Sequence, residues 1–493
     1  MSPMPAERYP GRQTVWTQRF FAPPPGTGAI LLVDFGSTYT KVTAVEAESG
    51  RLLGTAQHPT TVETDVLQGY EAARDALRGI LSNATFGAVL GCSSAGGGLR
   101  LAVVGLEPEL TADAARRAAL SAGARIVTVI TRGLTNGSLA QLVEARPDIV
   151  LLAGGTNGGN GAVLIESARA LANSRLEIPI ILAGNEEAQP SAYELLRKGG
   201  KHAVTAPNLM PEIGVVDERP VREVIRNLFV HHVIGGKHLS SRPDFGAMIR
   251  MPTPDAVLAA TELLAGGVGL EAGLGDLMVI DVGGATTDVH SVVRAEQPGG
   301  YAHDLVNPPV GRTVEADLGL RWNAPGILEA AAAELPRRDL THRREAAERR
   351  AGHPTFVADS PAEIEADLEL ASCAIDIAVH RHAGRLSIEL SPQGAALRKS
   401  GRDLRAVSTV VLSGGIVRHA PADALPQLLP ANDGDDRILL PRHPRFAVDR
   451  AYLLAAAGLL ATRDRQAAFA LMSQGLTYVS DSAPERLRWT ASN

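Results

Sequence analysis

The chain has 493 residues, of which 45% are hydrophobic and 21% charged, so it is long enough for two to four domains and has an ordinary globular composition. Its formal net charge of -6 argues against a general nucleic-acid binder, a class that is normally basic. Its two cysteines, Cys92 and Cys373, are too few for a disulfide framework, a four-cysteine zinc site or an iron–sulfur cluster within one chain, and they fit a reducing, cytoplasmic setting.

Residues 1–27 are rich in proline and glycine and predict a flexible N-terminal arm. This arm has no apolar core segment, so it is not expected to be a signal peptide. No stretch of about 18 uncharged apolar residues occurs along the chain, and a membrane span is therefore not expected.

The first informative segment is a short apolar run, residues 29–33, followed by the polar stretch DFGSTYTK and a second β-rich run. The run is too short for a helix and rich in valine and isoleucine, so the pattern predicts strand, tight turn, strand. Taken alone, this hairpin could equally be a surface turn. The residues of this hairpin that could bind a ligand or take part in catalysis are Asp34, Gly36, Ser37, Thr38, Thr40 and Lys41.

An alternating pattern of strands and helices follows, and it predicts a parallel sheet. Strands are expected at 88–94, 125–130, 148–155 and 178–184, with helices near 111–122, 135–145, 161–173 and 188–198. We assign residues 28–100 to a first lobe and 101–250 to an inserted α/β segment. Within the segment, GGTNGGN (154–160) joins a strand to a helix, and is either an anion cradle or a tight βα turn, the second being favoured.

Residues 276–293, DLMVIDVGGATTDVHSVV, repeat the layout of the first hairpin. Asp281, like Asp34, is the last residue of an apolar strand, and Gly283, Gly284, Thr286, Thr287 and Asp288 follow it. A degenerate repeat half a chain apart indicates two related lobes that each offer a turn to a shared cleft. A second lobe is assigned to 251–463, with a loosely attached tail at 464–493.

Further along the second lobe, helices are predicted at 254–267, 363–384 and 449–463, and a strand at 408–415. The strand runs into Gly414 and Gly415 just before an expected helix start, where the base and sugar of a nucleotide could be held. The intervening segment 336–354 alternates basic and acidic residues. This pattern favours a solvated helix or a partner-docking surface over nucleic-acid binding.

Two such turns facing one ligand are suited to a polyphosphate. Glycine allows close approach of the backbone, whose N–H groups donate to phosphate oxygens together with the hydroxyls. The aspartates would instead hold hydrated Mg²⁺, which takes few carboxylates and keeps several waters. The pattern thus predicts an Mg–ATP clamp with Asp34 and Asp281 as metal-site acids, and it differs from a P-loop, whose GK[ST] ending is absent.

Each assignment has a structural alternative. Asp34 and Asp281 could instead cap their turns without binding a ligand, and the threonines could be present because β-branched residues favour strands. Asp288 could orient water or merely stabilise its turn. Lys41 could meet a phosphate or lie in solvent. Cys92 is interpreted as a small core residue rather than a nucleophile.

The order DFGSTYTK, DVGGATTDV, VVLSGGIVR resembles the phosphate-1, phosphate-2 and adenosine motifs of the actin, sugar-kinase and heat-shock chaperone ATPase superfamily. Helices 254–267 and 449–463 resemble its two connecting helices. More specifically, the chain resembles the MutL/GlmL family of glutamate mutase accessory proteins. The segments that carry this likeness are LLAGGTNGGN (151–160), APNLMPEIG (206–214), MPTPDAVL (251–258), RTVEADLGLR (312–321) and VHRHAGRL (379–386).

The resemblance covers residues 28–463 and implies a two-lobed actin-like ATPase fold, built from duplicated ribonuclease H-like domains. It also implies a chaperone-like, reactivating role towards an adenosylcobalamin-dependent mutase, with ATP and Mg²⁺ as cofactors and mutase subunits as partners. One departure stands out: heat-shock chaperones place a glutamate before the proline of the first connecting segment, where this chain has Thr253 before Pro254. Asp255 or another acid would then position the attacking water, or hydrolysis would be slow.

Two other functions remain open from the sequence. A small-molecule kinase of the same fold would need a base aspartate poised for a substrate hydroxyl. A nucleotide-dependent scaffold without turnover is favoured by the missing glutamate.

Overall fold

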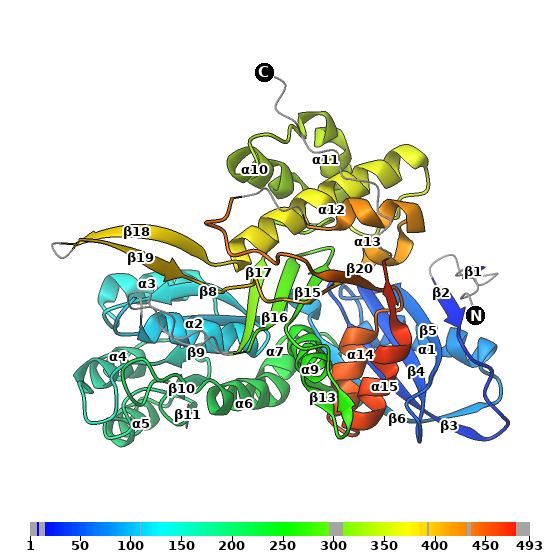
Figure 1. The fold of residues 1–493 in the computed structure, drawn as a ribbon. Coiled ribbons are helices and arrows are strands. Elements are labelled where there is room, and N and C mark those ends of the chain that lie inside the picture. The colour runs from blue at the N-terminus through cyan, green and yellow to red at the C-terminus, as the bar shows by residue number, and fades with distance from the viewer. Residues whose placement is uncertain are drawn as a thin grey trace.

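The computed structural model describes residues 7–8, 15–108, 110–294, 309–391, 394–430 and 435–479. The chain forms two lobes and an inserted α/β unit, which lies at the left of Figure 1 while the first-lobe sheet lies at the right. Among the described helices, none combines the length and the apolar character needed to cross a membrane.

The first lobe is built on a seven-stranded sheet in the order β1-β2-β5-β4-β3-β6-β12. Its central strands are rich in β-branched and leucine residues that are buried on both faces, as in β3, where residues 29–35 are all buried. The strands are β1 (Glu7–Arg8), β2 (Trp16–Arg19), β3 (Thr27–Phe35), β4 (Tyr39–Glu46), β5 (Leu52–Pro59), β6 (Ala84–Ser93) and β12 (Ile249–Pro252), and helix α1 (Val66–Ile80) covers one face.

The second lobe repeats this topology. Its sheet has the order β17-β16-β15-β20-β21-β22, so in both lobes three antiparallel strands are followed by two parallel ones in the order 3-2-1-4-5. The strands are β15 (Leu277–Val282), β16 (Thr287–Val292), β17 (Val310–Glu315), β20 (Thr409–Gly414), β21 (Arg445–Asp449) and β22 (Leu476–Tyr478). This duplication is the two-lobed actin-like ATPase fold, and the predicted fold class is confirmed.

Helices α9 (Thr253–Gly266) and α14 (Leu453–Ala461) occupy equal positions after the fifth strand of each lobe and pack against each other between the two sheets (Figure 1). They meet closely because Gly458 has no side chain: a Cβ there would lie 1.9 Å from the backbone oxygen of Ala256. A shared apolar cluster from both sheets and both helices surrounds this contact. The two lobes are therefore joined through a well-packed helix pair.

The inserted unit has a five-stranded parallel sheet in the order β11-β10-β9-β7-β8. Its strands are β7 (Leu99–Val104), β8 (Ala124–Ile130), β9 (Ile149–Leu152), β10 (Ile180–Leu182) and β11 (Ala203–Thr205). Its helices are α2 (Thr111–Ser121), α3 (Asn136–Glu144), α4 (Ala162–Ala172), α5 (Gln189–Lys198), α6 (Arg219–Leu228), α7 (Ile234–Gly236) and α8 (Pro243–Met248), with a π-helical turn at Phe229–Val233. The strand expected at 88–94 is part of β6 in the first lobe, where it pairs with β3.

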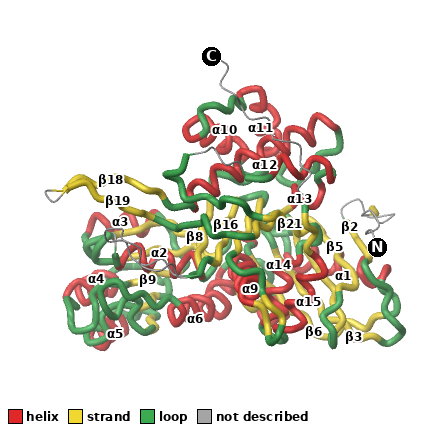
Figure 2. The backbone as a smooth tube through the Cα atoms, viewed as in Figure 1, coloured by secondary structure: helices red, strands yellow, loops and turns green. Residues whose placement is uncertain are grey.

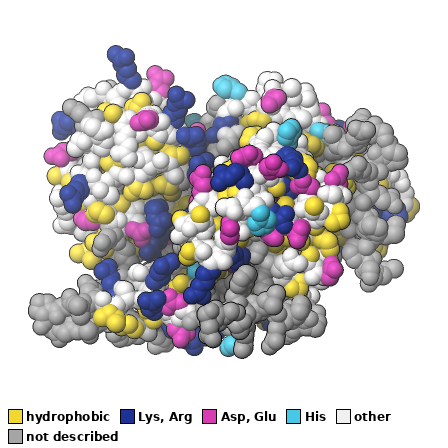
Figure 3. All heavy atoms as spheres, turned by 90° about the horizontal axis from the view of Figure 1, so that it is seen from above, with side chains coloured by type: hydrophobic (Ala, Val, Ile, Leu, Met, Phe, Trp, Pro, Cys, Tyr) yellow, Lys and Arg dark blue, Asp and Glu magenta, His cyan; other side chains and the backbone are white. Residues whose placement is uncertain are grey.

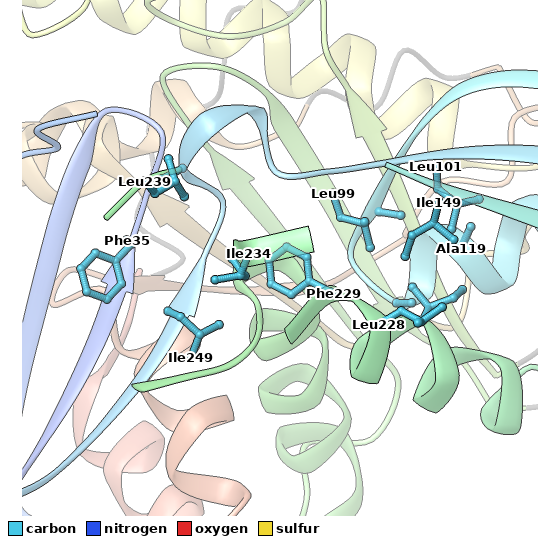
Figure 4. Packing of buried hydrophobic residues seen from close by; sticks show 14 of the residues in the cluster. Phe35, Leu99, Leu101, Ala119, Ile149, Leu228, Phe229, Ile234, Leu239 and Ile249 are labelled. Atoms are coloured by element: carbon cyan, nitrogen blue, oxygen red, sulfur yellow. The ribbon is translucent and has the colours of Figure 1, made fainter. Parts of the chain in front are cut away.

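The inserted unit and the first lobe share one hydrophobic core. Figure 4 shows Phe35 and Ile249 on the first-lobe side, Leu99 and Ile149 on the inserted side, and Phe229 between them. Because buried contacts run continuously across this junction, the inserted unit and the first lobe are packed together as one body.

The upper part of the second lobe is helical and lies above its sheet (Figures 1 and 2). It contains α10 (Ala324–Glu334), α11 (Arg344–Gly352), α12 (Pro361–His382) and α13 (Gly415–His419), and a hairpin of β18 (Arg385–Ser391) and β19 (Gly394–Ser400) projects from it. From above, acidic and basic side chains are interspersed over this region (Figure 3). The charged segment 336–354 is held by ion pairs to α12, among them Arg343–Glu369 and Arg350–Asp367.

At both ends of the described chain, residues that the sequence assigned to an arm or a tail form part of the lobes. Strand β2 pairs with β5, so residues 16–19 extend the first sheet rather than forming a flexible arm. Helix α15 (Arg465–Gly475) packs on α14, and β22 pairs with β21, so the predicted tail begins later than residue 464. Residues 1–6, 9–14 and 480–493 lie outside the described part.

Candidate functional site

A cavity of about 390 Å³ lies where the two repeated turns face each other between the lobes. The turn between β3 and β4 forms one wall and the turn between β15 and β16 forms another. Of the residues expected from sequence, those that line the cavity are Asp34, Gly36, Ser37, Thr38, Lys41, Asp281, Gly283, Gly284, Thr286, Asp288, Gly414 and Gly415.

The two turns approach within contact distance. A Cβ on Gly284 would lie 2.6 Å from Thr38 Oγ1, so a larger residue at position 284 would block the gap between the lobes. Thr38 Oγ1 is itself buried and has no hydrogen-bond partner among the described residues. A buried hydroxyl without a partner costs free energy, and a ligand oxygen in the cavity would relieve that cost.

Asp34 is firmly held by its neighbours. Lys41 Nζ lies 3.2 Å from Oδ2, and the Thr253 hydroxyl donates to Oδ1 at 2.7 Å. Cys92 Sγ lies 3.8 Å from the same Oδ1, and burial raises the pKa of this thiol well above its usual value. Cys92 is fully buried, which matches the interpretation of a core residue.

Lys41 connects the two acidic turns. Burial by itself would lower the pKa of its ammonium, but the carboxylates of Asp34 and Asp281 outweigh that effect and raise the pKa above its usual value. Nζ also lies 4.3 Å from the ring centroid of Tyr452, which begins α14 in a left-handed conformation at φ 57°. The Lys41 cation is therefore fixed at the cavity wall rather than dissolved in solvent.

Asp281 has a different environment. Among the described residues, its carboxylate makes no hydrogen bond or ion pair, although it lines the cavity. Burial raises the pKa of its carboxyl to about 6, with the carboxylates of Asp288 and Asp34 adding to the effect and Lys41 opposing it. An acid with this shift has an unsatisfied demand for a cation or a hydrogen-bond donor.

Asp288 links the cavity to the inserted unit. Its Oδ2 accepts from Arg312 Nη2 at 2.7 Å, and Arg312 Nη1 donates to the backbone oxygen of Leu120, near the end of α2, at 3.0 Å. The other carboxylate oxygen of Asp288 is buried without a partner among the described residues. One side of this carboxylate is thus fixed, and the other remains available at the cavity wall.

The third expected element also lies at the cavity. Strand β20 runs parallel to β15 with Gly414 opposite Val282, which places the glycine pair beside the second turn. Gly414 has φ 111°, and a Cβ there would lie 2.2 Å from the Val282 oxygen, so no other residue fits without moving the strand.

Two of the expected threonines point away from the cavity. Thr40 Oγ1 lies 3.2 Å from Thr60 Oγ1, and Thr287 donates to the Leu318 oxygen at 2.7 Å; both side chains are fully buried. The reason is strand alternation, since their neighbours Lys41 and Asp288 face the cavity. Direct contact of Thr40 and Thr287 with a phosphate is therefore not supported.

Asp255 is also not a candidate for positioning water. It is fully buried, and its carboxylate is bound by Arg222 at 2.8 Å and Arg226 at 2.6 Å. The cavity wall contains Thr253 and Pro254 but not Asp255. This acid fastens α6 to α9.

The loop 154–160 lies away from the cavity, at the carboxyl end of β9. Its polar groups are used internally: the Asn208 amide donates to the Gly155 oxygen at 3.0 Å and the Asn157 side chain at 2.7 Å, and the Asn185 amide donates to the Thr156 oxygen at 2.6 Å. The structure thus has the tight βα turn that the sequence favoured.

Sequence reasoning missed several residues of the cavity wall. Thr253 was noted only as a departure from a pattern, and Arg125, Arg321 and Tyr452 carried no local signal. Ser93 and Ser94, at the end of β6, belong to the stretch CSSAGGG (92–98), whose sequence pattern favours a tight turn over an anion cradle. The backbone oxygen of Ser94 accepts a hydrogen bond from the Ser37 hydroxyl at 3.1 Å. What they share is visible only in the fold, which brings them to one cavity from separate segments of the chain. These residues are Ser93, Ser94, Gly97, Arg125, Thr253, Arg312, Arg321 and Tyr452.

The residues present fit a magnesium–nucleotide pair. Two strand-end carboxylates match the small number that Mg²⁺ takes from proteins when waters and phosphates complete its shell. The described residues contain no cluster of three or more metal-binding side chains, so the cavity does not contain a closed, all-protein metal site. Glycine turns, an unpartnered hydroxyl and a fixed lysine supply the neutral donors and the cation that phosphate oxygens need.

Comparison with known proteins identifies the family of this chain. The family model for the MutL protein matches residues 30–476. The chain is also 40% identical over 444 residues to "Protein MutL" of Clostridium tetanomorphum, covering 88% of this chain and 96% of that protein. The chain belongs to the MutL family.

This MutL-family chain also resembles solved kinase structures at low identity. A ROK family glucokinase from Streptomyces griseus, solved with glucose and AMPPNP, is 12% identical with a TM-score of 0.27, covering 88% of this chain and 99% of that one. A gluconate kinase from Lactobacillus acidophilus is 10% identical with a TM-score of 0.32, covering 92% and 93%.

Proposed function

We propose that this MutL-family protein binds Mg–ATP in the interlobe cavity and acts as a slow ATPase. Its role would be that of an accessory, chaperone-like protein that reactivates an adenosylcobalamin-dependent mutase, such as glutamate (methylaspartate) mutase, in the cytoplasm. The observation that carries the nucleotide part is that Asp34, Asp281 and the Gly414–Gly415 turn, distant in sequence, line one cavity between two duplicated lobes.

Each group has a role in this proposal. Asp281, whose carboxylate has no protein partner among the described residues, would hold the hydrated metal together with Asp34. Bound Mg²⁺ would neutralise the phosphate charge. Lys41, Thr38 and the two turns would hold the phosphate oxygens, and the free oxygen of Asp288 would orient the attacking water. Family membership supports the mutase partner.

Nucleotide binding is the first test. Calorimetric titration with ATP, with and without Mg²⁺, is expected to give metal-dependent binding. Asp281→Asn is expected to lower the rate of hydrolysis about 100-fold or more while weakening binding much less, because the lost charge matters most as charge shifts in the transition state. Equal hydrolysis rates for the variant and the parent would contradict the role of Asp281.

The partner needs a separate test. A glutamate mutase inactivated by turnover is mixed with free coenzyme, this protein, and either ATP or a non-hydrolysable analogue. Recovery of activity with ATP alone is the expected result, because a cycle between two states requires a ligand that distinguishes them. No recovery, together with ADP formation that depends on a small hydroxylated compound, would favour a kinase instead.

A further inference from the structure

The inserted unit contributes a side chain to the cavity that no part of the proposal above uses. Arg125, at the start of β8, lines the cavity and is exposed. Its guanidinium makes no hydrogen bond or ion pair among the described residues. Arginines at such junctions normally have carboxylate partners, as Arg312 and Arg222 do nearby. An unpaired guanidinium in a cleft is suited to an anion.

The surroundings of Arg125 are built for close approach of a ligand. The turn after β6 has three successive glycines in left-handed or related conformations, with φ 63° at Gly96, 84° at Gly97 and 65° at Gly98. Gly97 and Gly98 line the cavity, and a Cβ on Gly97 would meet nothing within 4 Å. The glycines therefore leave open space on this side of the cavity.

A second observation points to a ligand at the same place. Arg312 joins the second lobe to the Leu120 oxygen of the inserted unit, five residues before Arg125. Beside it, Asp288 is only 6% exposed, and one of its carboxylate oxygens is buried without a hydrogen-bond partner among the described residues. A water oriented by that oxygen and a phosphate that meets Arg125 would satisfy both groups.

We propose that Arg125 is a cation, supplied in cis by the inserted unit, that contacts the terminal phosphate of ATP and stabilises the charge that develops on it. This inference rests on the proposed ATP-binding function. The shared core attaches Arg125 to the first lobe, while the turn between β15 and β16 belongs to the second lobe. Arg125 then reaches the phosphate fully only when the lobes are closed, and the Arg312–Leu120 bond holds the inserted unit in that position.

The test separates ground-state binding from transition-state binding. Affinity is measured for Mg–ADP and for Mg–ADP with aluminium fluoride, which mimics the phosphoryl group in transfer. Arg125→Ala is expected to leave the affinity for ADP within about twofold, to weaken ADP–aluminium fluoride at least tenfold, and to lower kcat by about 100-fold, on the scale of other arginines that meet a transferring phosphoryl group. Arg125→Lys should have an affinity for ADP–aluminium fluoride and a kcat between those of the parent and those of Arg125→Ala.

Arg169→Ala is the matched control, because Arg169 is an exposed arginine on α4 of the same inserted unit and does not line the cavity. Added guanidinium should restore part of the hydrolysis in Arg125→Ala and none in the Asp281→Asn variant. If Arg125→Ala behaves like Arg169→Ala with all ligands while the parent binds ADP–aluminium fluoride, the inference is wrong. If the parent binds no magnesium nucleotide, the proposed function fails, and the inference fails with it.

Discussion

The two repeated turns join strand pairs with the same arrangement but have opposite electrostatics. In the first, Asp34 lies across the strand pair from Lys41, and in the second, Asp281 lies across from Asp288. An opposite-charge pair on neighbouring strands is stabilising, whereas a like-charge pair is not. Duplication thus produced one turn whose acid is neutralised within its own hairpin and one whose acid is not.

The consequence is a division of roles. Asp34 is held by three side chains before any ligand arrives, while Asp281 carries the cost of burial and of neighbouring carboxylates. Asp288 is partly compensated by Arg312, a residue of the neighbouring strand β17. The second turn therefore stores an electrostatic cost that a cation in the cavity would remove, and the first provides a rigid wall.

The largest effect is expected from removing the cation that serves both turns. Lys41→Met leaves Asp34, Asp281 and Asp288 close together without that charge, and we expect the free energy of unfolding to fall by about 3 kcal/mol at pH 7.5. Chemical unfolding at pH 7.5 and pH 5 measures this, and the deficit should shrink at pH 5 as Asp281 gains a proton. Lys198→Met, at an exposed lysine of α5, is the control. Equal losses in the two variants would refute the central position of Lys41.

Replacing the two aspartates should shift stability in opposite directions. The pKa of Asp281 is raised from 3.8 to about 6 in the folded state, so the folded protein binds more protons across that window and the stability of the parent falls as pH rises through it. Asp281→Asn should therefore be more stable than the parent by about 2 kcal/mol at pH 7.5, with a smaller difference at pH 5. Asp34→Asn removes the partner of Lys41 and should be less stable by a similar amount. Losses of equal sign would mean that the turns are electrostatically alike.

The sequence predicted the parts of this site that depend on local pattern. The apolar strands, the strand-end aspartates and the glycine turns are each encoded within ten residues, and strand alternation could have shown that Lys41 and Asp288 face away from Thr40 and Thr287. Thr253 and Arg125 could not be found in this way. They reach the cavity through pairing of β12 with β6 and through the core shared by the inserted unit and the first lobe.

The same limits apply to the ends of the fold. Residues 464–478 lack a strong apolar period, yet α15 is buried through Ala468 and Leu471 against α14. These residues are ordered by packing against α14, which is one helix of the pair between the lobes. Long-range packing of this kind is not visible in a single segment.

A smaller effect is expected in the pH dependence of ligand binding. Magnesium binds the ionised carboxylate, so protonation of Asp281 competes with it below about pH 6. Mg–ATP affinity of the parent should fall by up to tenfold for each pH unit below 6, and calorimetric titration between pH 5 and pH 7.5 measures it. Asp281→Asn should bind more weakly at pH 7.5 but without this slope. A flat profile for the parent would place the metal elsewhere.

The smallest effect concerns a contact that only the first turn has. Tyr39, between Thr38 and Thr40, reaches across the cleft and donates its hydroxyl to the Thr355 oxygen at 3.0 Å, in the loop of the second lobe whose residues Pro354 and Phe356 line the cavity.

The hydroxyl of Tyr39 has an exposed environment, so its loss should cost less than about 1 kcal/mol of stability. It bridges the lobes directly, however, and its loss should favour the open cleft. Tyr39→Phe is therefore expected to raise the rate of nucleotide release a few-fold while the unfolding midpoint stays nearly constant, and stopped-flow displacement of a fluorescent nucleotide measures this rate. Tyr193→Phe, at an exposed tyrosine of α5, should change neither quantity. If release is unchanged in Tyr39→Phe, the lobes are held closed by the Thr38–Gly284 approach and the helix pair, and the first turn acts on the ligand alone.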